Sequence, residues 1–112
     1  MNRTAGDVAG ALRQRILALP DVREQTPAGI HEDAFFVGRR MFMHIHGGTH
    51  CDIRLPLDAQ SRALEQGDAR PHRWAPEAGY VTVLVRDTAD IEKAMNLIRI
   101  SHEYASRAGA RG

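Results

Sequence analysis

The stretch from residue 41 to residue 55 restricts the fold more than any other part of the chain. It has the pattern of two β-strands joined by the pair Gly47-Gly48. Side chains alternate between the two faces of a strand, so the first strand has one apolar face and one face that carries histidine. The apolar face holds Met41, Met43 and Ile45, and the opposite face holds Phe42, His44 and His46. The stretch therefore predicts a β-hairpin with one face in the core.

The length of the hairpin loop decides which residues of the second strand enter the core. A two-residue loop would bury His50 and Asp52, and an unpaired polar group costs roughly 2–7 kcal/mol to bury. A three-residue loop over residues 47–49 instead buries Cys51 and its apolar neighbours. We therefore predict the three-residue loop, with His46 opposite His50 and His44 opposite Asp52. Facing pairs of this kind have Cβ atoms about 5 Å apart.

Length, composition and charge indicate one globular domain over residues 1–112, with an ordered core at about 7–105. Hydrophobic residues make up 43% of the chain, which is enough for a core and argues against disorder. The 15 basic and 14 acidic side chains leave a formal charge of +1. A chain so nearly balanced lacks the electrostatic footprint of a general nucleic-acid binder.

The single cysteine, Cys51, excludes an intramolecular disulfide and favours a reducing compartment, so we expect a cytoplasmic protein. The N-terminus has no basic region followed by an apolar run, so no signal peptide is expected. No apolar stretch approaches the ~20 residues of a membrane helix, and we expect no membrane partner.

The periodicity of apolar residues predicts an α+β fold. Helices are expected at residues 7–19, at 58–66 with Asp58 as its N-cap, and at 88–105 after an N-cap at Asp87, followed by a frayed tail. Strands are expected at residues 33–37, 40–46, 51–55 and 80–85, with a loop over 67–79. The predicted order is α-β-β-β-α-β-α, which indicates a four-stranded antiparallel sheet with its helices packed on one face.

The hairpin register predicts that polar side chains gather on the sheet face away from the helices. These residues are His44, His46, His50, Asp52 and Arg54. Imidazole and carboxylate groups are ligands for Zn²⁺ or Fe²⁺, so the first four form a candidate metal site. The alternative is an ordinary solvated face whose His-Asp pairs only stabilise the hairpin. On either interpretation these side chains are expected to be exposed.

The loop over residues 70–74 is the second unusual segment, because it combines Arg70, His72, Arg73 and Trp74. Arginine and histidine side chains can bind a phosphate, a carboxylate or a base. The alternative is that Trp74 packs into the core and the arginines are solvated.

The residues around this hairpin resemble the small bacterial proteins of the "luciferase domain" family. The likeness rests on His44-x-His46-Gly47, Asp52 and Pro56, on Arg70-Pro71-His72 and on Gly79-Tyr80-Val81, and extends over about residues 10–105. Relatives typically carry glycine at Met43 and tryptophan at Tyr80. The order of elements also resembles the YjbR (MmcQ-like) family, which implies a helix before an antiparallel sheet and an Arg-Pro loop before the last strand. That family's link to DNA binding is an analogy of fold.

Together these features predict a small-ligand-binding domain for an anionic or phosphate-bearing ligand. Its expected binding residues are His44, His46, His50, Asp52, Arg54, Arg70, His72 and Arg73. One alternative is a metal-dependent hydrolase or oxygenase that uses His44 and His46 with Asp52 or His50. Others are a nucleic-acid-binding module dependent on Arg54, Arg70 and Arg73, and a homodimer that covers the same sheet face.

Overall fold

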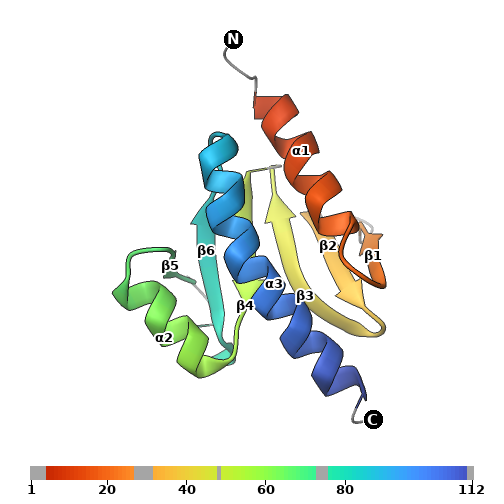
Figure 1. Cartoon of the computed structure of the whole chain (residues 1–112), viewed down its shortest axis with the longest axis vertical. Helices are drawn as coiled ribbons and strands as arrows, with labels where there is room; N and C mark the ends of the chain where they lie inside the picture. Colours follow the sequence, from red (N-terminus) through yellow and green to blue (C-terminus); the bar gives the residue numbers. More distant parts are fainter. Residues whose placement is uncertain (1–4, 27–31, 48, 73–75, 111–112) are drawn as a thin grey trace.

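The computed structural model describes residues 5–26, 32–47, 49–72 and 76–110, which fold around one antiparallel sheet (Figure 1). In chain order its elements are α1 (Ala5–Leu17), β1 (Val22–Gln25), β2 (Glu32–Val37), β3 (Arg40–His46), β4 (His50–Arg54), α2 (Leu57–Glu65), β5 (Arg70–Pro71), the 3-10 helix η1 (Pro76–Ala78), β6 (Tyr80–Leu84) and α3 (Thr88–Ala110). The α+β prediction is confirmed. None of the described helices is long and apolar enough to cross a membrane.

The sheet has six strands in the order β1-β2-β3-β4-β6-β5, so the prediction of four strands was wrong. The two additional strands are β1 and β5, one at each edge. In β1 only Val22 is apolar, and β5 has two residues of which one is Pro71, so neither shows the alternation that marks a strand. These edge strands form by backbone pairing, β1 with β2 and β5 with β6. Because both strands were missed, the predicted element order was also wrong.

Helices α1 and α3 lie side by side across one face of the sheet, and α2 contacts β6 (Figure 1). Side chains at helical spacing form a buried stripe along α3, while His102 is only partly buried. The stripe consists of Ile91, Ala94, Met95, Ile98, Ser101 and Ala105. α3 contacts β2, β3 and β4, and its apolar side chains belong to the same core cluster as Met43, Ile53 and Val81. Full burial of one such large side chain contributes about 1.5–3 kcal/mol, so this helix–sheet layer is the main source of stability.

The hairpin of β3 and β4 has the predicted register. His44 pairs with Asp52 and His46 pairs with His50 across a three-residue loop in which Gly47 has a φ of +61°. Cys51 is fully buried, and that burial raises the pKa of its thiol to about 12, so it is a core residue and no nucleophile.

Phe42 does not lie on the histidine face as the alternation predicted. Phe35 pairs with Met43 and Phe36 with Met41, which leaves Phe42 as an additional residue in a β-bulge. Its ring lies edge-on to His102 of α3, with the centroids 5.7 Å apart, and Ser101 Oγ donates a hydrogen bond to its carbonyl oxygen. The bulge therefore turns Phe42 toward α3 and keeps a bulky ring off the histidine face.

The helix ends differ from prediction in two places. The N-cap of α2 is Pro56, and Asp58 lies in the first turn, so the predicted cap was two residues too late in the chain. Asp87 is confirmed as the cap of α3, because its Oδ1 accepts a hydrogen bond from the Asp90 amide. The predicted fraying of the tail is wrong for residues 106–110, which continue α3. Alanine and arginine there are good helix formers.

Gly79 is a position where the fold demands glycine. Its φ is +95°, and a Cβ built there would lie 2.1 Å from the carbonyl oxygen of Leu55. Gly67 has a similar φ of +74° but open space around it. We expect Gly67→Ala to cost about 1 kcal/mol of unfolding free energy through backbone strain alone, and Gly79→Ala to cost about 3 kcal/mol or more. Urea denaturation measures both, and equal losses would contradict the close approach.

Candidate functional site

Asp52 lies at the centre of the sheet face opposite α3. It pairs with His44 of β3 on one side and with Thr82 of β6 on the other. Only 2% of Asp52 is exposed, so the expectation of a solvated residue was wrong. The side chains of the neighbouring strands and His72, which follows β5, cover the carboxylate.

Five side chains surround the Asp52 carboxylate, and we call this group the histidine-aspartate cluster: Asp52 with His44, His46, His50, His72 and Thr82. The Nε2 atoms of His44 and His46 lie 2.9 and 2.7 Å from Oδ2. Thr82 Oγ1 donates to Oδ1 over 2.8 Å. The Nε2 atoms of His50 and His72 each lie 3.5 Å from a carboxylate oxygen.

The hydrogen bonds to Asp52 outweigh the effect of its burial. Burial by itself raises the pKa of a carboxyl group, because it disfavours the charged form. The hydrogen bonds from His44, Thr82 and His46, with the favourable charge of His44, hold the pKa of Asp52 well below its ordinary value. The cluster is therefore built around a carboxylate that stays ionised.

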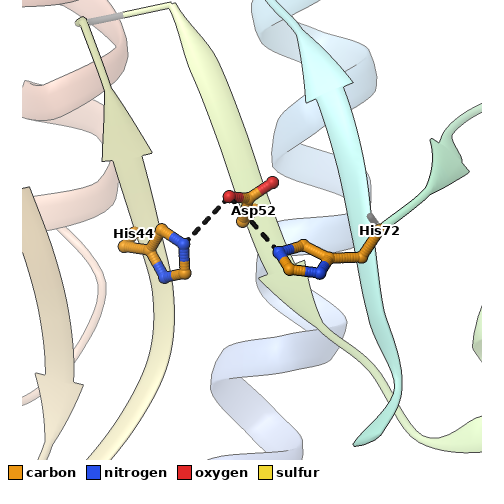
Figure 2. Close-up of side chains that lie close together, drawn as sticks. All are labelled: His44, Asp52 and His72. Carbon is orange, nitrogen blue, oxygen red and sulfur yellow. Dashed lines mark hydrogen bonds and ion pairs between the residues drawn. The ribbon is translucent and has the colours of Figure 1, made fainter. Parts of the chain in front are cut away.

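His72 reaches the cluster because β5 pairs with β6. Arg70 faces Thr82 and Pro71 faces Val81, so the next residue, His72, is placed against the sheet face (Figure 2). Its ring packs 5.4 Å from that of Tyr80, which also lies 5.9 Å from the ring of His44. Burial raises the pKa of the Tyr80 phenol. No local pattern marked Tyr80 or Thr82 as a site residue, because only the pairing of β6 with β4 brings them to this face.

A pocket of about 500 Å³ opens beside the cluster. Its described lining residues are His46, His50, Asp52, Arg70, Pro71, His72, Thr82 and Leu84. Arg70 is exposed at this pocket, while Asp52 forms part of its buried floor. The volume lies within the range of small-molecule sites, roughly 300–1,000 Å³.

The arginines expected at the site have different positions. Arg70 lines the pocket, but Arg54 lies elsewhere, with its Nε donating to the carbonyl oxygen of Ala78 over 3.2 Å. Arg54 is close enough to Tyr80 that its charge acts on the phenol. Arg73 and Trp74 lie outside the described residues. The structure thus brings together His44, His46, His50, Asp52, His72 and Arg70, and separates Arg54 from them.

Fold and site define a class: a small α+β domain whose antiparallel sheet carries a buried carboxylate ringed by histidines. The chain belongs to the Luciferase domain family, whose model matches residues 39–101, more than half of its length. The matched region contains every residue of the histidine-aspartate cluster and the described pocket lining. A search of the curated proteins finds no match.

Replacing Asp52 by Asn tests the depressed pKa of its carboxyl group. The amide keeps the shape but not the charge, so we expect a loss of about 2 kcal/mol of unfolding free energy at neutral pH. In the unfolded chain the carboxyl titrates near its ordinary pKa, about 3.9. Because the folded protein binds this proton more weakly, the stabilisation is present above about pH 4 and is lost as the pH falls toward the lower folded pKa.

Urea denaturation of both proteins from neutral pH into acid measures this effect. The difference in stability between wild type and Asp52→Asn should shrink below about pH 4. A difference that stays constant over that range would show that the carboxylate is not the stabilised species.

Proposed function

We propose that this chain is a small-ligand-binding domain and that its ligand is anionic, with a phosphate or a carboxylate group. The observation that carries the proposal is the pocket beside the histidine-aspartate cluster, which is lined by the guanidinium of Arg70 and by three imidazoles. These imidazoles belong to His46, His50 and His72. Such N–H donors bind oxyanions through charge-assisted hydrogen bonds.

The charge distribution within the pocket supports an anion. Asp52 is the only carboxylate among the described lining residues. Its oxygens already accept hydrogen bonds from His44, His46 and Thr82, which stabilise the carboxylate within the cluster. Arg70 then supplies a full positive charge at the exposed side of the same pocket. A ligand that extends from Arg70 toward the imidazoles meets donors along its length.

The shape of the site favours a small ligand over a polymer. Nucleic-acid binders use a stripe of basic side chains that follows the phosphate backbone. Here one arginine of the described lining and a formal net charge of +1 favour a compact anion instead.

Two further inferences come with this proposal. The likeness to the YjbR family is supported by α1 before the sheet, by the Arg70-Pro71 segment and by α3 after the last strand. The cytoplasm is the proposed compartment, because Cys51 is the one cysteine of the chain.

Inorganic phosphate is the probe for the proposed pocket. An amide NMR titration of protein kept in a chelator should shift signals of residues 46–52 and 70–72, and the affinity should fall with added salt. We expect Arg70→Gln to weaken phosphate at least ~10-fold, since a hydrogen bond to a charged group contributes about 1.5–3 kcal/mol. Arg99→Gln is the matched control, because it removes the same charge from an exposed position on α3.

Equal weakening in the two variants would assign the binding to overall charge and not to the pocket. If phosphate shifts no signal of the pocket residues, the anionic-ligand proposal is wrong. A molecular mass by size exclusion of twice 12.4 kDa, with the same residues protected, would instead favour the homodimer.

A further inference from the structure

We infer that His44, Asp52 and His72 form a binding site for one divalent transition-metal ion. This goes beyond the anionic-ligand proposal and does not depend on it. The two histidines approach the same carboxylate oxygen from opposite sides, one from β3 and one from the segment after β5 (Figure 2).

The spacing of the three ligand atoms suits a single ion. One atom from each residue lies within 4.8 Å of the other two. The Nε2 atoms of His44 and His72 are 2.9 and 3.5 Å from Asp52 Oδ2. In a tetrahedral zinc site with bonds of about 2.0–2.1 Å, neighbouring ligand atoms are about 3.3 Å apart, so the two distances bracket the required value. Small rotations of the two rings would complete the site.

The crowding of imidazoles around Asp52 Oδ2 is a second indication of a metal site. The Nε2 atoms of His44, His46 and His72 all lie within 3.5 Å of Asp52 Oδ2. A carboxylate oxygen has two lone pairs, and the hydrogen bonds with His44 and His46 already use both, while the imidazole of His72 lies close to the same oxygen. A dication relieves this competition, because it binds the oxygen and the imidazole lone pairs at the same time, with Nδ1 carrying each ring's proton.

In metal sites, hydrogen bonds from neighbouring residues commonly fix the orientation of the ligand side chains. The carboxylate of Asp52 has such a neighbour. Thr82 Oγ1 donates to Oδ1 over 2.8 Å, which holds the carboxylate plane and leaves Oδ2 for the ion. The three side chains are 14%, 3% and 9% exposed, so few waters compete with the ion's ligands. Rigid strands supply two of the three ligands.

The donor set indicates the class of ion and an open coordination position. Two imidazoles and one carboxylate suit Zn²⁺ and Fe²⁺, and three protein ligands leave room for water or a bound anion. Asp52 and His72 also line the pocket, so a free position on the ion faces the proposed ligand. Such a site would provide the metal for a hydrolase or an oxygenase.

The test uses the full chain without an affinity tag, stripped of metal and titrated with Zn²⁺ alone and Co²⁺ alone. We expect one ion per chain by calorimetry and, for Co²⁺, visible absorption bands that report imidazole and carboxylate coordination. Removal of a ligand in His72→Ala or His44→Ala should weaken binding at least ~10-fold. His102→Gln is the matched control, because it removes a histidine that bonds to Pro20 far from the cluster.

His72→Ala is the decisive variant, because His72 lies outside the strand ladders and its loss leaves the pairing of β3, β4 and β6 intact. Far-UV circular dichroism checks that it is folded. Wild type that binds no stoichiometric ion, or a folded His72→Ala that binds as tightly as His102→Gln, would overturn the metal site. The phosphate titration in chelator is separate, so the metal site and the anion pocket can fail independently.

Discussion

The ionised carboxylate of Asp52, buried in the middle of the sheet, is the constraint on which the rest of the site depends. A charge in that position is tolerated only if several donors satisfy it, because its desolvation otherwise costs several kcal/mol. The donors come from three directions: His44 and His46 on β3, Thr82 on β6 and His72 after β5. Satisfying this one group therefore ties the hairpin to both later strands.

The two faces of the sheet differ in the kind of side chain that they carry. The face beneath α1 and α3 is apolar and closely packed, with Phe35, Ile53 and Val81 fully buried. The opposite face concentrates titratable groups around one carboxylate. Well-packed apolar residues in place of the whole cluster would be at least as good for stability, since a buried ionic group seldom stabilises more than a hydrophobic one of similar volume. Residues that do not give the greatest stability are expected at functional sites. The buried ionic cluster therefore agrees with both proposals.

Sequence reasoning succeeded where the signal is local. The hairpin register followed from the alternation of residues 41–55 and from the cost of burying Asp52 toward the helices. The buried side of α3 followed from the helical spacing of its apolar residues. Its N-cap followed from the position of Asp87 directly before the helix. Sequence reasoning missed β1 and β5, because their residues show little alternation of apolar and polar side chains. It also placed Phe42 on the wrong face, because a β-bulge turns this residue toward α3.

By itself the sequence determined that His44, His46, His50 and Asp52 share one face of a hairpin, because side chains alternate strictly along paired strands. Only the tertiary structure decided that β6 lies beside β4 and β5 beside β6. These pairings add Thr82 and His72 to the face and bury the carboxylate, while Arg54 hydrogen-bonds to Ala78 and not to the cluster. Pairing between strands distant in the chain depends on how all the elements pack together, and no local pattern specifies it.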